Sequence, residues 1–169
     1  MGEEEVGQIG RKRYYVNLPP AERPLRTRCR PGTFGRTLPK SHREALPPIA
    51  VSDRGKPYFP DSPWHFSISH TPCHAFCALA KCPIGIDAEE QARRVNPKLA
   101  EKVLSASEKL RFNQCSDKND SFLRLWVLKE AAAKFTGEGL KGYPNHTDFS
   151  PDDPRIQTID GCYVAVFTE

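Results

Sequence analysis

The sequence has 169 residues and a formal net charge of +4, which is long enough for one domain with a hydrophobic core. No apolar run reaches the roughly 18 residues that a membrane-spanning helix needs, and the first residues lack the apolar segment of a secretory signal. Six cysteines occur without a C-x-x-C pair. We therefore expect reduced thiols in a cytoplasmic protein.

The positive charge is concentrated near the N-terminus. Residues 11–54 hold eleven Lys or Arg against three Asp or Glu, a balance of +8. We expect no regular structure over residues 1–13, and loops over 14–63 with at most a short helix near Lys40–Leu46. Such a segment attracts phosphates, nucleic acid or an acidic protein. The ordinary alternative is a solvated arm, which the charge taken alone favours.

Clear periodicity begins at Trp64. The segment WHFSISH alternates between apolar and polar side chains, which predicts a half-buried strand with Trp64, Phe66 and Ile68 on one face and the polar residues on the other. HAFCALA, residues 74–80, predicts a neighbouring strand, and PIGIDAEE, residues 83–90, predicts a third.

Helix signals follow these strands. The capping box SASE, residues 105–108, predicts a helix that runs to about Gln114. A second helix is expected to begin at Asn119 or Asp120 and to end at Gly137.

RIQTIDGCYVAVF then predicts a hairpin, with a type I′ turn at Asp160-Gly161. Strands, two or three helices and further strands indicate an α+β domain in which an antiparallel sheet packs with helices.

One cluster of metal-binding residue types needs weighing. His70, Cys73, Cys77 and Cys82 fall within thirteen residues and could in principle bind zinc. Their spacings fit no familiar zinc motif, and Cys77 lies in an apolar stretch. We therefore disfavour a zinc site.

Two carboxylates on the third predicted strand point the same way. Asp87 and Glu89 are two residues apart, so alternation places them on one face, about 7 Å apart along the chain. Ile84, Ile86 and Ala88 take the other face. Like charges held together repel unless a cation lies between them, and a hard divalent cation fits such oxygen ligands. Taken alone, the pattern favours the ordinary alternative, which is the acidic, solvated end of a strand.

The second helix carries charges beside an apolar stripe. Counting by 3.6 residues per turn, Glu130 shares a face with Trp126 and Lys134. The ordinary alternative is a surface ion pair worth a few tenths of a kcal/mol. Lys129 points about 100° away from Glu130, and packing or a structural ion pair explains it at least as well as catalysis.

Four short motifs occur in one order along the chain. They are G-K-P at residues 55–57, S-H at 69–70, G-I-D-A-E at 85–89 and W-V-L-K-E-A-A-A-K at 126–134. Together they resemble the signatures of the 4′-phosphopantetheinyl transferases of the surfactin-synthetase-activating (Sfp) type, in the subgroup with K-E-A in the last motif. The resemblance extends over about residues 54–169. The holo-acyl-carrier-protein synthase type fits less well, because its G-x-D motif lies close to the N-terminus.

The resemblance implies a reaction. Such enzymes transfer the 4′-phosphopantetheine group of coenzyme A to a serine of an apo acyl or peptidyl carrier protein and release 3′,5′-ADP. By this resemblance, Asp87, Glu89 and Glu130 would hold Mg²⁺, and Glu130 would also be the best-placed base.

The same resemblance assigns the phosphate contacts. Lys134 would neutralise the pyrophosphate and act with Glu130 and His70 in catalysis. His70 and Lys56 would bind the region of the 3′-phosphate, and Ser69 would belong to the same coenzyme A site.

The N-terminal part departs from the family. We divide the chain into a basic, Pro-rich, shortened segment, 1–53, and a transferase domain, 54–169, because the family usually has a fuller first half. The alternatives are a short active member, a dimer, or a catalytically degenerate member that acts as a carrier-protein-binding module.

The basic segment has two predicted uses. Arg26, Arg28 and Arg30 are candidates for holding the 3′-phosphate or for steering an acidic carrier protein. Nucleic acid is a disfavoured partner, because only Tyr14, Tyr15 and Phe34 lie among the basic residues as stacking platforms.

Overall fold

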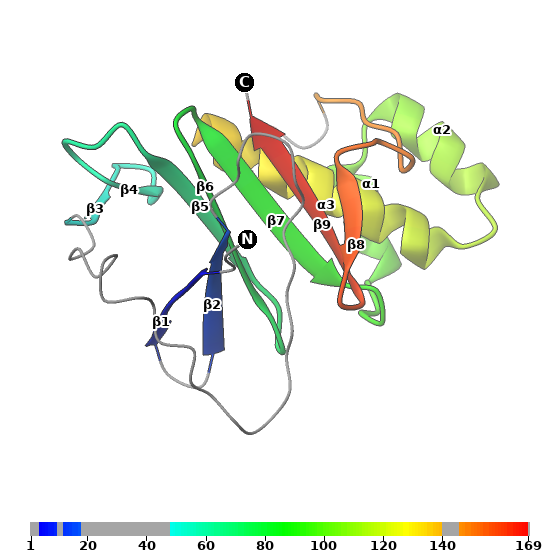
Figure 1. Ribbon diagram of the computed structural model, residues 1–169. Coiled ribbons are helices and arrows are strands. Elements are labelled where there is room, and N and C mark those ends of the chain that lie inside the picture. The colour runs from blue at the N-terminus through cyan, green and yellow to red at the C-terminus, as the bar shows by residue number, and fades with distance from the viewer. Residues whose placement is uncertain (1–3, 10–11, 18–47, 140–145, 169) are drawn as a thin grey trace.

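The computed structural model describes residues 4–9, 12–17, 48–139 and 146–168 (Figure 1). The short helix expected near Lys40–Leu46 and the three candidate arginines, Arg26, Arg28 and Arg30, lie outside these residues. None of the helices in the described ranges combines the length and apolar character needed to span a bilayer.

The first sheet contains four strands in the order β1-β2-β6-β5. These strands are β1 (Glu4–Ile9), β2 (Lys12–Asn17), β5 (His65–His70) and β6 (Ala75–Ala80). Strands β2 and β6 run parallel, and the other neighbours are antiparallel. The expectation of no regular structure over 1–13 was therefore wrong for the part described, because β1 and β2 pair with each other and β2 pairs along the edge of β6. The expectation of loops over 14–63 was likewise wrong for the end of β2 and for two short strands at residues 50–51 and 57–58.

The second main sheet has the order β7-β9-β8, with every pair antiparallel. Its strands are β7 (Ile84–Glu90), β8 (Ile156–Ile159) and β9 (Cys162–Thr168). Asp160 and Gly161 between β8 and β9 have φ of 46° and 76°, as the predicted type I′ turn requires. The short strands β3 (Ala50–Val51) and β4 (Pro57–Tyr58) form a separate antiparallel pair.

Three helices lie between β7 and β8 in the chain: α1 (Pro97–Val103), α2 (Ala106–Gln114) and α3 (Lys118–Thr136). The predicted capping box of α2 is present, since Ser105 and Glu108 each satisfy the other's backbone N–H. Helix α3 begins after Asp117, slightly earlier than expected, and ends at Gly137 in the left-handed conformation, as predicted. The predicted α+β class with antiparallel sheets and packed helices is confirmed.

The β7–β9–β8 sheet is covered on both faces. Helix α3 runs along one face (Figure 1), where Leu123, Val127 and Leu128 meet Tyr163 and Ala165. The opposite faces of β7 and β9 pack against strand β6 in a second apolar cluster. Its fully buried members are Phe76, Ala78, Ile84, Ile86, Ala88, Cys162 and Val164. Alternation then leaves Gly85, Asp87 and Glu89 on the α3 side of β7.

Strand β5 buries two serines of its polar face. Ser67 and Ser69 are 5% and 4% exposed, whereas Ile68 is 37% exposed. The strand itself is confirmed, but the expectation that its polar residues face away from the interior was wrong for these two serines. The reason is that both hydroxyls accept hydrogen bonds from the backbone of β7, so burial leaves them satisfied.

Candidate active site

Gly85 sets the spacing between strand β7 and helix α3. A Cβ atom at this position would lie 2.2 Å from the carbonyl oxygen of Ala131 and 2.4 Å from the backbone nitrogen of Phe135. Such contacts with rigid helix backbone are far inside van der Waals distance, so only glycine permits this approach. The close packing brings the carboxylates of β7 within reach of the charged residues of α3.

Asp87 is the hub of the site. Its Oδ1 accepts hydrogen bonds from Ser69 Oγ and Lys134 Nζ, each at 2.8 Å. Its Oδ2 is buried and has no hydrogen-bond partner among the described residues. Burial raises the pKa of the Asp87 carboxyl, while Lys134 and Ser69 oppose that shift. One half of this carboxylate is therefore anchored and the other half is left for an additional positive partner.

Lys134 bridges helix α3 to both neighbouring strands. Besides its ion pair with Asp87, its ammonium donates to the carbonyl oxygen of Ile68 at 3.3 Å. The Lys134 side chain is 31% exposed. An ammonium held this way carries a fixed positive charge while it still reaches solvent, as a phosphate-binding group must.

Glu130 lies one helical turn before Lys134 and has a strongly perturbed acidity. Burial, followed by the negative charge of Asp87, raises the pKa of Glu130 to about 7. Lys134 and Arg93 counteract this shift, and Glu89 adds to it. A carboxyl that titrates near neutral pH can accept and release a proton, which is the property of a general base.

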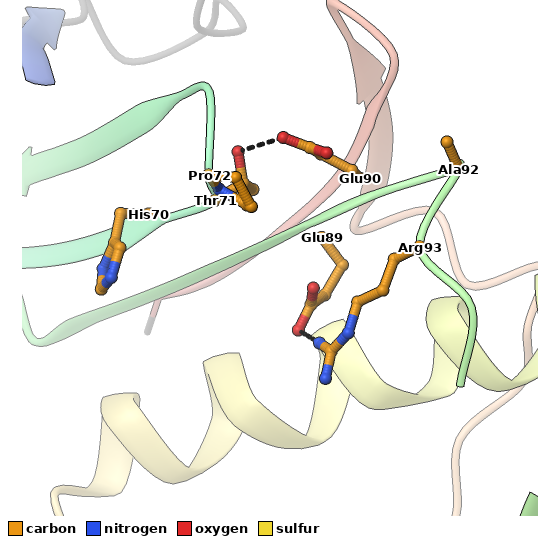
Figure 2. Close-up of a pocket in the computed structure, with 7 residues that line it drawn as sticks. All are labelled: His70, Thr71, Pro72, Glu89, Glu90, Ala92 and Arg93. Atoms are coloured by element: carbon orange, nitrogen blue, oxygen red, sulfur yellow. Dashed lines mark hydrogen bonds and ion pairs between the residues drawn. The ribbon is translucent and has the colours of Figure 1, made fainter. Parts of the chain in front are cut away.

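Glu89 forms an ion pair with Arg93 (Figure 2). Figure 2 shows both side chains on the α3 side of β7, whereas Glu90 points to the turn at Thr71. Thr71 Oγ1 donates to Glu90 at 2.9 Å, which anchors that carboxylate away from the site. Glu89, by contrast, pairs with the partly exposed side chain of Arg93.

Two hollows are lined in part by predicted site residues. The larger, of about 570 Å³, is lined by residues 70–72 and by Glu89, Glu90, Ala92 and Arg93. It contains the exposed His70 at the end of β5 (Figure 2). The smaller, of about 220 Å³, includes Lys56, Glu130 and Lys134 in its lining. His70 and Glu89 therefore line one hollow, and Lys56, Glu130 and Lys134 line the other.

The ammonium group of Lys56 is hydrogen-bonded to backbone carbonyl oxygens. Its ammonium donates to the carbonyl oxygens of Phe135 at 3.0 Å and Ile84 at 3.4 Å, and burial lowers its pKa. A lysine on the final carbonyls of a helix stabilises the helix dipole. Lys56 thus ties the end of α3 to the start of β7, and this structural role stands beside its predicted part in phosphate binding.

The three predicted metal ligands are electrostatic neighbours. In the described part of the chain, no three His, Cys, Asp or Glu side chains are grouped as ligands of one ion. This finding covers the three carboxylates and also the cluster of His70 with Cys73, Cys77 and Cys82. The three carboxylates nevertheless fit a hard divalent cation, because Asp87 Oδ2 is a buried acceptor without a described partner and the carboxylates repel one another. Magnesium commonly takes one or two carboxylates, completing its shell with water and substrate phosphates.

Two contributing residues were missed in the sequence. Ser67 accepts a hydrogen bond from the backbone nitrogen of Ile86 at 3.1 Å, and Arg93 pairs with Glu89. The two-residue spacing of Ser67 and Ser69 was a usable signal, because it places both hydroxyls on one face. No sequence pattern marked Arg93, whose position follows from the turn that ends β7, where its N–H donates to the Glu90 carbonyl.

Comparison with known proteins supports the family resemblance of the sequence. Residues 83–162 match the family model of the 4′-phosphopantetheinyl transferase superfamily. The chain is 35% identical over 95 residues to the 4′-phosphopantetheinyl transferase Sfp of Bacillus subtilis, covering 54% of this chain and 42% of that protein. It is 32% identical over 110 residues to the 4′-phosphopantetheinyl transferase gsp of Aneurinibacillus migulanus, covering 64% and 45%.

A third relative extends the match. A putative 4′-phosphopantetheinyl transferase of Haemophilus influenzae is 31% identical over 116 residues, covering 66% of this chain and 49% of that protein. The matches therefore span about half the length of these relatives. With the motifs and the fold, they confirm the resemblance of this chain to the 4′-phosphopantetheinyl transferase superfamily.

Proposed function

We propose that this protein transfers the 4′-phosphopantetheine group of coenzyme A to a serine of an apo acyl or peptidyl carrier protein, with release of 3′,5′-ADP. The observation that carries the proposal is the environment of Asp87, a buried carboxylate held by Lys134 and Ser69 through one oxygen and open at the other. An ordinary solvated strand end has no such half-satisfied acceptor.

The proposed metal is Mg²⁺, held by Asp87 with Glu89 and Glu130 as further candidate ligands. When bound, the cation neutralises charge on the pyrophosphate oxygens. Arg93 contacts only Oε1 of Glu89, so Glu89 would act as a ligand through Oε2 or by exchanging the guanidinium of Arg93 for the cation. Burial and, after it, repulsion from Asp87 raise the pKa of Glu130. The repulsion supports this assignment, since a cation among these carboxylates would relieve it.

Glu130 is the proposed general base. One of its carboxylate oxygens would accept the proton of the carrier serine hydroxyl. The serine oxygen would then attack the β-phosphorus of coenzyme A, and 3′,5′-ADP would leave. Without the cation, the pKa of Glu130 is about 7, and a bound cation would lower it and favour the ionised base at neutral pH. The location of Glu130 on the lining of the smaller hollow gives an incoming hydroxyl a route to it.

The cationic side chains are the proposed phosphate contacts. Lys134 would stabilise the growing charge of the pyrophosphate from its position on Asp87. His70, in the larger hollow, and Lys56, in the smaller, would bind the region of the 3′-phosphate. This reaction also implies a cytoplasmic setting, where coenzyme A and carrier proteins are both present.

The decisive experiment is mass spectrometry of an apo carrier protein incubated with coenzyme A, Mg²⁺ and this protein. We expect the carrier to gain the mass of one phosphopantetheine group, and Asp87→Ala to abolish the gain while the variant retains its circular dichroism spectrum. An unmodified carrier that nevertheless binds the protein would reject the enzymatic proposal and leave a carrier-binding module.

A further inference from the structure

Strands β5 and β7 lie side by side but belong to different sheets. The N–H groups of Ile86 and Ala88 donate to the hydroxyls of Ser67 and Ser69, each at 3.1 Å. Serine side chains thus take the place that strand carbonyls would occupy in a continuous sheet. The two serines share this structural task, and each satisfies one buried backbone donor of β7.

The second serine has an additional contact. The hydroxyl of Ser69 donates to Asp87 Oδ1 at 2.8 Å while it accepts from the backbone of Ala88. Because Ala88 directly follows Asp87, a single hydroxyl is tied to both the backbone and the side chain of the same short segment. The donor direction of Ser69 is therefore constrained by the strand on which Asp87 sits.

This constraint acts on the rotation of the carboxylate. A carboxylate turns easily about χ2, since its two oxygens are chemically equivalent and the torsion is broad. Here Ser69 and Lys134 converge on Oδ1, and Oδ2 is buried without a described partner. Lys134 alone could pair with either oxygen, because its ammonium has three donors and no preferred plane.

We propose that Ser69 is a positioning residue that fixes the rotation of the Asp87 carboxylate, so that Oδ1 faces Lys134 and Oδ2 is presented to the divalent cation. The inference rests on the proposed function, because it assigns one oxygen of Asp87 to the proposed metal. It gives Ser69 a role different from the coenzyme A contact implied by the family resemblance, since this hydroxyl is buried and already both donates and accepts.

The chain provides a matched control. Ser67→Ala and Ser69→Ala each remove one hydroxyl that accepts from β7, but only Ser69→Ala removes the donor to Asp87. We expect similar losses of thermal stability in the two variants. We also expect Mn²⁺ affinity to fall at least fivefold in Ser69→Ala and to change less than twofold in Ser67→Ala. Mn²⁺ prefers the same oxygen ligands as Mg²⁺, and its free form is counted by electron paramagnetic resonance.

Equal Mn²⁺ affinities in the two variants would overturn the inference, and so would absence of Mn²⁺ binding by the wild type. If Ser69→Ala does not fold, the Ser69→Cys and Ser67→Cys pair, which keeps the size of the side chain with a weaker donor, provides the same comparison. Because the readout is metal binding, a wild type that binds Mn²⁺ but leaves the carrier unmodified would reject the proposed reaction separately from the role of Ser69.

Discussion

Helix α3 carries two lysines whose ion pairs differ in completeness. Lys129 and Glu108 are both fully buried and lie 2.8 Å apart. Lys129 also donates to the carbonyl of Thr147, and Glu108 accepts from the backbone of Ser105 and Phe149. This pair joins α2 and α3 to the segment before β8, which confirms that a structural ion pair explains Lys129.

The pair between Lys134 and Asp87 is incomplete by comparison. Lys134 is partly exposed, and Asp87 Oδ2 has no hydrogen-bond partner among the described residues. The pKa of the neighbouring Glu130 is raised to about 7 by burial and by the charge of Asp87. Burying charges is favourable only when their remaining donors and acceptors are satisfied. A pair that meets this condition holds a fold together, whereas a pair that leaves an acceptor open is suited to a ligand.

The largest expected effect comes from breaking the complete pair. Lys129→Met would leave the buried Glu108 carboxylate without its cation, and we expect a loss of about 3–5 kcal/mol in the free energy of unfolding. Urea denaturation measures it. Lys134→Met is the control, with an expected loss of about 1 kcal/mol, because Asp87 can become protonated. Equal losses would contradict the distinction between the two pairs.

Widening the gap between β7 and α3 should be nearly as costly. Gly85→Ala places a methyl group against the backbone of Ala131 and Phe135, and overpacking of this kind costs about 3 kcal/mol at the upper end of its usual range. The variant should also lose transferase activity beyond any loss of folded protein. Urea denaturation and carrier mass spectrometry measure the two effects. Wild-type stability would show that the strand can shift without cost.

Glu130→Gln tests whether the residues around the incomplete ion pair take part in the transfer reaction. We expect the transfer rate to fall by about 10² or more, since the amide keeps the shape but cannot accept the proton. Single-turnover measurement of carrier modification provides the rate. Lys134→Ala is the companion variant, and we expect a lower rate with retained Mn²⁺ binding. Near wild-type rates in both variants would contradict the catalytic roles and would mean that Glu130 and Lys134 form only a surface ion pair.

Glu130→Gln should also change the pH dependence of stability in metal-free buffer. The folded pKa of Glu130, about 7, lies above its ordinary value of 4.5, so the folded state binds more protons between these values. The wild type should therefore lose stability as the pH rises from about 4.5 to 7. Glu130→Gln should be more stable than the wild type by about 1 kcal/mol at pH 8, after allowance for partial exposure, and equal to it below pH 4.5. Chemical denaturation at several pH values tests this, and equal stability at pH 8 would refute it.

The smallest expected effect concerns the guanidinium on Glu89. If Arg93 competes with the cation, Arg93→Gln should bind Mn²⁺ about three- to fivefold more tightly, equivalent to roughly 1 kcal/mol. Electron paramagnetic resonance measures this affinity, and the neighbouring Arg94→Gln serves as a control. Weaker binding in Arg93→Gln alone would mean that Arg93 orders Glu89 for the metal.

The sequence by itself determined the local features of the fold. Ser105 and Glu108 predicted the start of α2, and Gly137 predicted the end of α3, because capping depends on residues a few positions apart. The Asp160-Gly161 turn was predictable for the same reason. The order of the motifs also indicated the family, and alternation placed Asp87 and Glu89 on one face of a strand.

Only the tertiary structure decided which partner each of those faces meets. Periodicity distinguishes two faces of β5 but cannot reveal that β7 offers backbone donors to Ser67 and Ser69. It likewise cannot pair Lys129 with Glu108, or show that Gly85 is needed against α3. These contacts join segments far apart in the chain, and their strength depends on burial and on the remaining hydrogen-bond partners. That is why two lysines five residues apart on one helix acquire different roles. Around Lys129, both carboxylate oxygens of its partner Glu108 accept hydrogen bonds. Around Lys134, one oxygen of its partner Asp87 has no hydrogen-bond partner among the described residues.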